Sequence, residues 1–405
     1  MKDRVALAVN TLSGGGAEKT AANLSRVLSQ YYDIDIIVND DAHLQYPYQG
    51  HVFSLQMPLV KNRMGTVYQL KALARRIRLL KKLKKERQYK AVLSFSEMTN
   101  LANVLSGKGK QKKSKTILSV HNDVRNTRDS GWRQRLVVTY LFPICFKWAD
   151  RTVACSREIA DVLVNEYGLA REKSVVIYNG LDLQRIKENT LKLPTQPLCK
   201  EDEKLVVSVG RMIKEKGQWH LIRAMKLLRD RGMPIKLIIL GEGELRSKLE
   251  ELVEEASLES SVFLPGFVEN PHQYMKRADA VVFPSLSEGF SNAIAEALAC
   301  GAPVISTDHE TGAREILAPN TDYRAKVHDR IEEAQYGLLV PVCDGIFRGV
   351  KEPLTKEEQM MAEAICRLVM NSKLGAQYRK AGPKRAEQLE IRSIVEAWTR
   401  VIEKG

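Results

Sequence analysis

The stretch 279–299 constrains the fold more than any other part of the chain. Residues 279–285 (Asp-Ala-Val-Val-Phe-Pro-Ser) contain an apolar, β-branched run, which predicts a buried parallel strand. Residues 293–299 are rich in Ala and favour a helix. A loop therefore leaves the carboxyl end of a strand and enters a helix, and ligands of open α/β sheets bind at that edge.

The loop between this strand and helix has the chemistry of a ligand site. Gly289 lets the backbone approach a ligand closely, and the first N–H groups of a helix attract negative charge. Those N–H groups belong to Phe290, Ser291 and Asn292. Glu288 and Glu296 accept hydrogen bonds and so suit a ligand rich in hydroxyl groups. The alternative is that both acids are solvated charges beside a helix.

Length and composition bound the class of protein. A chain of 405 residues is too long for one ordinary core and predicts two domains. It is 44% hydrophobic and 28% charged, as soluble globular proteins are. The chain opens without a signal-peptide layout, and its longest apolar run, 136–146, is too short to cross a bilayer. Six cysteines without a Cys-x-x-Cys pair predict reduced thiols in a cytoplasmic protein.

Strands and helices alternate along the chain, which predicts parallel sheets with helices on both faces. In the first half we expect strands near 4–9, 34–38, 91–95, 116–120, 151–154 and 175–178. In the second half we expect them near 204–209, 235–240, 262–264, 280–284, 303–306 and 337–340. The two halves thus predict two doubly wound units, and the stretch 182–203, with its prolines and charges, is typical of a linker.

The spacing of Glu288 and Glu296 is a Glu-x7-Glu signature, and the agreement with a known family extends beyond it. Together with 299–308 (ACGAPVISTD) and 312–317 (GAREIL), it resembles the GT4 glycosyltransferases of the GT-B fold. The resemblance implies an α/β protein of two Rossmann-like, doubly wound parallel-sheet domains with an interdomain cleft. We expect an acceptor-binding domain at 1–185, a linker at 186–203, a nucleotide-sugar-binding domain at 204–388 and a helix crossing back at 389–405.

A glycine-rich turn follows the first expected strand, at residues 10–19. Backbone N–H groups of such a turn can close on a phosphate, although the Walker and G-x-G-x-x-G patterns are missing. Gly15 and Gly16 match the family's Gly-Gly-Ala-Glu start, and the resemblance implies that this loop lies beside the donor diphosphate and the acceptor. A tight turn without a ligand is the alternative.

A second strand–glycine–cation pattern runs through residues 205–217. Arg211 offers a planar fork of donors and Lys216 a compact charge, which together suit a diphosphate. The resemblance implies that both residues hold the leaving nucleotide, with Glu288 on the sugar hydroxyls and Glu296 on the ribose hydroxyls. A basic pair on the surface is the alternative.

Three residues of the first half are further candidates. His121 ends an expected strand, and the resemblance implies that it contacts the donor sugar near the reacting carbon, although a lone histidine is more often structural. Glu97 and Asn100 follow the preceding strand and are candidate acceptor contacts, and helix capping by Thr99 or Asn100 is an equally good interpretation.

Asp33 and Asp35 form a D-x-D, which some glycosyltransferases use to hold a metal ion. Here the motif opens an apolar strand, so we interpret it as charge at the strand edge. We expect no metal and no other cofactor, because the nucleotide sugar is a substrate.

The net charge of +14 is concentrated in the first half, since residues 1–180 carry 30 Lys and Arg against 15 Asp and Glu. Residues 71–90 include ten of these cations, and Leu70, Leu73, Ile77 and Leu80 would line one face of a helix. Such a helix can lie on an anionic membrane, or its apolar face can pack on the sheet while its charges are solvated. The two interpretations are compatible, because the apolar face can pack on the sheet while the basic face contacts the membrane. Few aromatic residues interleave the cations, so we do not expect nucleic acid as a partner.

The resemblance implies a retaining, metal-independent glycosyltransferase. It would move a hexose or N-acetylhexosamine from a nucleotide-diphosphate sugar, with UDP as the expected nucleotide, to a saccharide or lipid-linked saccharide. The basic first half predicts work at the inner face of the cell membrane, in the assembly of cell-surface polysaccharides or glycans. A nucleic-acid-binding protein without enzyme activity, and a related activity such as a nucleotide-sugar epimerase or a phosphorylase, are the alternatives.

Overall fold

The computed structural model describes residues 2–42, 44–56, 66–107, 114–129, 135, 137–194, 200 and 203–404. The chain divides into two compact units. Unit 1 comprises Met1–Gly180 and Glu390–Gly405, and unit 2 comprises Leu181–Leu389. The chain therefore enters unit 2 at residue 181, whereas we placed the end of the first domain at 185. The five cysteines that the structure describes are free, and Cys199 lies outside the described residues.

Unit 1 is built on a seven-stranded parallel sheet in the order β3-β2-β1-β4-β5-β6-β7. Its strands are β1 (Arg4–Val9), β2 (Asp33–Val38), β3 (His51–Ser54), β4 (Ala91–Phe95), β5 (Lys115–Val120), β6 (Arg151–Ala154) and β7 (Ser174–Val176). The strand order reverses between β1 and β4, which makes this point the topological switch of a doubly wound sheet.

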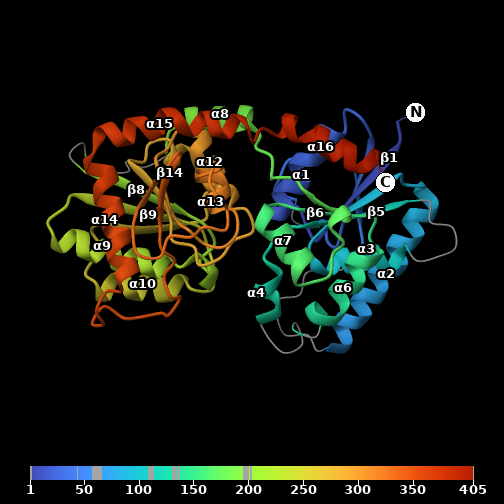
Figure 1. Ribbon diagram of the computed structural model, residues 1–405, viewed down its shortest axis with the longest axis horizontal. Coiled ribbons are helices and arrows are strands. Elements are labelled where there is room, and N and C mark those ends of the chain that lie inside the picture. Colours follow the sequence, from blue (N-terminus) through green and yellow to red (C-terminus); the bar gives the residue numbers. More distant parts are fainter. Residues whose placement is uncertain are drawn as a thin grey trace. The chain divides into compact units, whose positions relative to one another are not determined.

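Helices cover both faces of this sheet (Figure 1). They are α1 (Gly16–Leu28), α2 (Thr66–Arg87), α3 (Glu97–Ser106), α4 (Val124–Asp129), η1 (Val137–Leu141), α6 (Phe142–Trp148), α7 (Arg157–Asn165), η2 (Arg171–Lys173) and α16 (Ile391–Glu403). Val5, Leu7 and Val9 of β1 join one core cluster, and the alternate residues Ala6 and Ala8 join the other. This alternation follows from the period of two along a strand, and it explains why β1 is apolar throughout.

The last helix, α16, belongs to unit 1 although it follows unit 2 in the sequence. Val395, Trp398 and Ile402 are part of the core that includes β1 and α1. Lys115 donates hydrogen bonds of 2.8 and 2.7 Å to the carbonyls of Ile402 and Glu403, which satisfies orphan acceptors at the helix C-terminus. The chain thus returns from unit 2 to complete the core of unit 1.

Unit 2 contains a second seven-stranded sheet, in the order β10-β9-β8-β11-β12-β14-β13. Its parallel strands are β8 (Lys204–Val209), β9 (Ile235–Leu240), β10 (Val262–Gly266), β11 (Ala280–Phe283), β12 (Val304–Thr307) and β14 (Gly337–Val340), and β13 (Glu332–Ala334) pairs antiparallel with β14. The order reverses between β8 and β11, so the switch point of unit 2 lies between these strands.

The helices of unit 2 also flank its sheet (Figure 1). They are α8 (Leu183–Leu191), η3 (Lys214–Lys216), α9 (Gln218–Asp230), α10 (Arg246–Glu255), α11 (His272–Met275), α12 (Asn292–Ala299), α13 (Ala313–Leu317), α14 (Lys356–Met370) and α15 (Ser372–Glu387). Helix α8 lies inside the stretch where we expected a linker, and it packs against α11 and α12. Its start is capped by Asp182, whose carboxylate accepts from the N–H of Arg185.

Helix α2 confirms that the apolar face of the basic stretch packs on the sheet. Leu80 is buried in the core, and Leu73 and Ile77 pack against the same cluster. Leu70 belongs to α2, but its side chain lies outside the described residues. The opposite face carries exposed cations at spacings of three and four residues, which places them in one stripe. These are Lys71, Arg75, Arg78, Lys82 and Lys85.

Candidate functional site

The loops after β8 and β11 bring four of the predicted residues to one edge of the unit 2 sheet. Arg211 and Lys216 follow β8, and Glu288 and Ser291 follow β11. These strands are neighbours on either side of the switch point, so both loops leave at the carboxyl edge where the sheet splits. The expected donor residues of the second half therefore lie on adjacent loops of a single unit.

Gly217 allows the two loops to meet. Its φ of +59° is left-handed, and a Cβ there would lie 2.4 Å from the carbonyl oxygen of Pro284. Beside it, the N–H of Leu286 donates to the carbonyl of Glu215 over 2.8 Å. A side chain at residue 217 would push the loops apart, so the glycine is needed for Lys216 to reach the other loop.

Lys216 and Glu288 form an ion pair between these loops. The ammonium of Lys216 donates to Oε1 of Glu288, and the hydroxyl of Ser285 donates to the same oxygen over 2.9 Å. Burial by itself would raise the pKa of Glu288, but the charge of Lys216, with smaller contributions from His309 and Ser285, lowers it below its ordinary value. Glu288 is therefore a carboxylate at neutral pH, held ready to accept hydrogen bonds.

The N-terminus of α12 presents one hydroxyl without a partner, that of Ser291, beside this pair. Ser291 is left-handed, with φ of 59°, and does not cap the helix with its side chain. Its hydroxyl is buried and has no hydrogen-bond partner among the described residues. Strained backbone and an unsatisfied buried hydroxyl at the start of a helix are features of ligand sites. Phe290 is 2% exposed, so a ligand reaches its backbone rather than its ring.

Glu296 is buried within α12, where two side chains that the sequence did not point out hold it in place. Nδ2 of Asn189 lies 3.2 Å from Nδ1 of His272, and Nε2 of His272 lies 3.2 Å from Oε2 of Glu296. An amide nitrogen can only donate, so Nδ1 of His272 accepts and Nε2 carries the proton that Glu296 accepts. This chain fixes the orientation of the carboxylate.

His309 is a second residue that the sequence did not reveal. It follows β12, is 1% exposed, and neither ring nitrogen has a hydrogen-bond partner among the described residues. Burial lowers its pKa to about 4, against the opposing influence of Glu288, so the ring is neutral at neutral pH. Nearby, Thr311 donates its hydroxyl to the backbone carbonyl of Glu288 and ties the β12 loop to the β11 loop.

Arg211 differs from Lys216 in that its side chain is exposed. Its guanidinium makes no hydrogen bond or ion pair with the described part of the chain, and its fork of donors is available to an anion. The structure therefore brings Lys216, Glu288 and the α12 N-terminus into one cluster, and leaves Arg211 beside β8 with an unengaged charge.

In unit 1, the glycine turn also stands at a switch point. Gly14 has φ of +78°, Gly15 is the N-cap of α1, and Gly16 begins the helix. The N-cap has no side chain to cap the helix, and the carboxylate of Glu18 lies against Gly15, where a Cβ would overlap it. The turn thus lies where the sequence places it, at the carboxyl end of β1, and its binding of a phosphate stays a prediction.

His121 follows β5 and rests on a buried polar network. Its Nε2 lies 2.8 Å from the hydroxyl of Ser119, and its ring stacks on Phe95 with centroids 5.5 Å apart. Burial lowers the pKa of His121 to about 4, with the side chain of Asn179 opposing the shift. The imidazole is therefore neutral at physiological pH, which suits a hydrogen bond to a sugar better than charge stabilisation.

The two acceptor candidates have different surroundings. Asn100 is buried, and it accepts from Ser94 over 2.7 Å and donates to the carbonyl of Ser119 over 3.2 Å. These bonds join β4 to β5 beneath His121 and favour a structural role for Asn100. Glu97, at the start of α3, is partly exposed, and the residue before it, Ser96, has an unusual φ of 129°.

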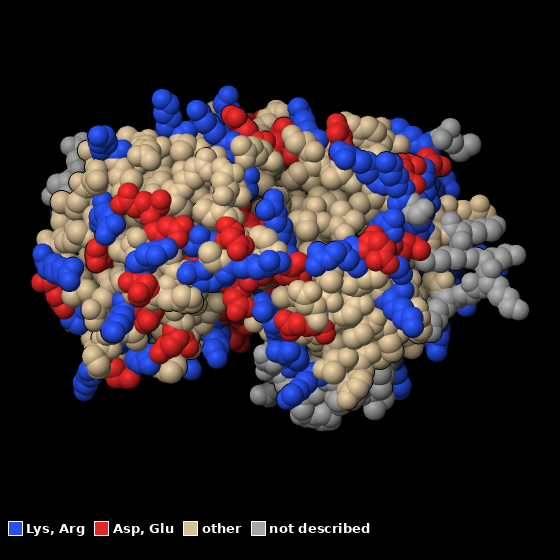
Figure 2. All heavy atoms as spheres, viewed as in Figure 1, with Lys and Arg blue, Asp and Glu red and all other residues tan. Residues whose placement is uncertain are grey.

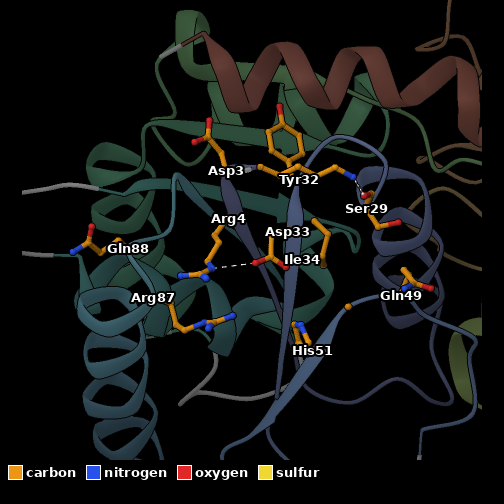
Figure 3. Close-up of a pocket in the computed structure, with 12 residues that line it drawn as sticks. Asp3, Arg4, Ser29, Tyr32, Asp33, Ile34, Gln49, His51, Arg87 and Gln88 are labelled. Carbon is orange, nitrogen blue, oxygen red and sulfur yellow. Dashed lines mark hydrogen bonds and ion pairs between the residues drawn. The ribbon is translucent and has the colours of Figure 1, made fainter.

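Both acids of the D-x-D are held by arginines of unit 1. Asp35 is buried and accepts from Arg87 at 2.7 and 2.9 Å and from the hydroxyl of Tyr89 at 2.8 Å. Asp33 accepts from Nε of Arg4 at 3.1 Å, on the wall of a cavity of about 610 Å³ (Figure 3). The cavity lies at the amino ends of β1, β2 and β3, the edge opposite the glycine turn, and the predicted site residues do not line it.

Solved structures share this fold. Sucrose-phosphate synthase from Thermosynechococcus elongatus has a TM-score of 0.77 and 20% identity, covering 100% of this chain and 99% of that chain. HepE from Anabaena, solved with UDP and glucose, has a TM-score of 0.73 and 18% identity, with 100% of each chain covered. The two Rossmann-like units therefore have the GT-B fold that we expected from the sequence.

Sequence comparison supplies the family. The model for Glycosyltransferase Family 4 matches residues 14–185, and the model for glycosyl transferases group 1 matches residues 190–335. An uncharacterized glycosyltransferase of Methanocaldococcus jannaschii is 31% identical over 71% of this chain and 72% of its own. The N-acetylgalactosamine-N,N'-diacetylbacillosaminyl-diphospho-undecaprenol 4-alpha-N-acetylgalactosaminyltransferase of Campylobacter jejuni is 29% identical over 88% of this chain and 91% of its own. The chain belongs to the glycosyltransferase family that these two models describe and that includes these relatives.

Proposed function

We propose that this glycosyltransferase is a retaining enzyme that moves a hexose or N-acetylhexosamine from a UDP-sugar to a saccharide or lipid-linked saccharide. The observation that carries the proposal is the Lys216–Glu288 pair beside the buried hydroxyl of Ser291, which has no hydrogen-bond partner among the described residues. It combines a cation, the hydroxyl of Ser291 and a carboxylate within adjacent loops. Those groups match the two halves of a nucleotide sugar, which are an anionic diphosphate and a polyol.

Donor binding would exchange the partners of the ion pair. The diphosphate would take the ammonium of Lys216, and the hydroxyls of the sugar would donate to the carboxylate of Glu288. Arg211 and the N–H groups of Ser291 and Asn292 would add further positive charge. Glu296, held by His272, would accept from the ribose hydroxyls.

The hard step in glycosyl transfer is departure of the leaving group from a sugar that acquires oxocarbenium character. Negative charge grows on the diphosphate as the bond breaks, and fixed cations and dipoles stabilise it without rearranging. We propose that Lys216 and Arg211 supply this stabilisation in place of a metal ion. Retention would follow from attack on the face from which the diphosphate leaves, with neutral His121 as the candidate for positioning the sugar.

The choice of donor and acceptor rests on the relatives. HepE was solved with UDP and glucose, and the name of the Campylobacter relative specifies an acceptor linked to diphospho-undecaprenol. We propose a UDP-sugar and a lipid-linked saccharide for this chain, in cell-surface polysaccharide or glycan assembly.

A membrane-linked acceptor requires work at a membrane surface. Within the described residues, no helix combines the length and apolarity needed to cross a bilayer. We propose that the exposed cation stripe of α2 contacts anionic headgroups at the inner face of the cell membrane, at about 1 kcal/mol for each Lys or Arg near the surface.

The test is transfer by purified protein with a panel of nucleotide sugars. Glu288→Gln and Lys216→Met are expected to lower kcat/KM by about 100-fold or more, in line with the loss of about 3 kcal/mol for one oxyanion donor. Lys226→Met, on the exposed face of α9, is the matched control and should leave the rate unchanged. Normal rates in both site variants would reject the assignment.

A further inference from the structure

The segment η1–α6 is apolar on both of its faces. Its inward residues are buried in unit 1, and they are Val138, Phe142, Cys145 and Phe146. A helix with apolar residues all round is normally enclosed by protein or lipid, because one face otherwise remains in water. This segment lies at the surface, so its outer face requires an explanation.

The outer face carries four large apolar or aromatic side chains. Tyr140 is 64% exposed, and Leu141, Ile144 and Trp148 are each 39% exposed. Ile144 and Trp148 are one helical turn apart, and Tyr140 and Leu141 precede them on the adjoining turn. Single exposed apolar residues are ordinary, but a contiguous group of this size marks a surface with a partner.

The residue types favour a lipid interface as that partner. Tyrosine and tryptophan have a polar group on an apolar ring and concentrate at the headgroup level of membranes, with aliphatic side chains beneath them. Lys147 is exposed between Ile144 and Trp148, where its long chain can reach the headgroups.

Helix α2 supplies positive charge in the same part of unit 1. Helix α3 packs against both α2 and α6, so the cation stripe of α2 and the apolar face of α6 belong to the same helical layer of unit 1. In the space-filling view, the surface over α6 is largely uncharged, and both basic and acidic side chains lie around it (Figure 2). An apolar face on α6 together with the cation stripe on α2 complements an anionic bilayer in both its hydrocarbon and its charge.

We propose that the η1–α6 surface, formed by Tyr140, Leu141, Ile144 and Trp148, inserts into the interface of an anionic membrane while α2 contacts its headgroups. The proposed cation contact of α2 would then be one of two attachments, and the second is apolar. Their salt dependence differs, because added salt screens the cations but leaves apolar insertion intact.

Vesicle sedimentation separates the two attachments. The double variant Leu141→Ser/Ile144→Ser should bind vesicles of phosphatidylcholine and phosphatidylglycerol at least about tenfold more weakly than the unmodified protein, a change of about 1.4 kcal/mol. The loss should persist at high salt. Leu193→Ser, at a residue of unit 2 that is 75% exposed, is the matched control and should bind normally. Equal binding by the double variant would overturn the proposal.

A spectroscopic measurement covers the case in which the double variant folds poorly. The measurement uses Trp132→Phe as the parent protein, because Trp132 lies outside the described residues. Brominated lipids should quench the tryptophan fluorescence of this parent and quench it less in Trp132→Phe/Trp148→Phe, because Trp219 and Trp398 are buried. Equal quenching in both proteins would contradict insertion. Light scattering in solution tests a second copy of the chain as the occupant, and a dimer lost in the double variant would also overturn the proposal. Neither measurement uses a sugar donor, so their outcome is independent of the proposed transfer reaction.

Discussion

Replacing Lys216 with Met would leave the carboxylate of Glu288 without its cation in a largely enclosed position. The side chains of Lys216 and Glu288 are 21% and 13% exposed. The pair therefore lies between a surface ion pair, worth about 0.5 kcal/mol, and a buried pair, whose disruption costs about 3–5 kcal/mol. Ser285 still donates to Glu288 in the variant. We expect Lys216→Met to destabilise unit 2 by about 2 kcal/mol at pH 7.5.

The destabilisation should depend on pH in a defined direction. With Lys216 present, the pKa of Glu288 is depressed, so its contribution to stability is present above the ordinary pKa of a glutamate and is lost as the pH falls. Without Lys216, burial dominates and raises the pKa above the ordinary value. The variant would then take up a proton at mildly acidic pH. Its stability should approach that of the unmodified protein as the pH falls from about 7.5 to about 4.5.

Calorimetry at the two pH values measures this effect. For a unit of this size, 2 kcal/mol corresponds to a shift in Tm of about 4–8 °C at pH 7.5. Lys216→Met/Glu288→Gln should recover part of the shift, because no buried charge remains unpaired. Lys226→Met, which removes a more exposed pair with Asp230, should shift Tm by much less. A shift for Lys216→Met that is the same at both pH values would refute the reasoning.

Three further predictions concern the donor site and the core of unit 1. His272→Ala frees the carboxylate of Glu296, so we expect binding of UDP to weaken about tenfold in titration calorimetry, with a smaller effect on kcat. A purely structural role of His272 would instead lower Tm and leave the affinity for UDP unchanged. Gly217→Ala would press a Cβ onto the carbonyl of Pro284 and should weaken UDP binding in the same assay. Gly232 is also left-handed but has open space around it, so Gly232→Ala should leave the affinity for UDP unchanged. Trp398→Ala should destabilise unit 1 by about 3–5 kcal/mol in thermal unfolding, since the ring is 3% exposed in the core, and a Tm within 2 °C of the unmodified protein would contradict the packing described.

The central parallel strands could be predicted from the sequence because they are buried on both faces. Runs such as Ile235–Leu240 are nearly continuous in apolar residues, and the position of the strand follows from that pattern alone. The strands that were not predicted lie at the sheet edges. β3 is four residues long and partly exposed, and β13 (Glu-Glu-Ala) carries two acids, so neither shows an apolar run. Because edge strands bury one side or none, their sequences show only a weak pattern of apolar residues.

The meeting of Lys216 with Glu288 could be expected only in part. Each residue follows an apolar strand, so its position at the carboxyl edge of a sheet is predictable. Their direct contact depends on β8 and β11 being neighbours and on Gly217 closing the gap between the loops. Strand order is a property of the whole sheet, and 72 residues separate the two partners in the sequence.

The hydrogen-bond partners of Glu296 could not be identified from the sequence near it. A buried carboxylate inside a helix needs hydrogen-bond donors, and one of those of Glu296 lies 24 residues away in the sequence. The donor His272 comes from a helix of four residues, and its own partner Asn189 comes from α8, in the stretch expected to be a linker. A chain of hydrogen bonds across three short elements leaves no periodic signature, because each residue contributes one polar side chain to an otherwise ordinary segment. The need for such partners can be deduced from burial, but their identity requires the packed unit.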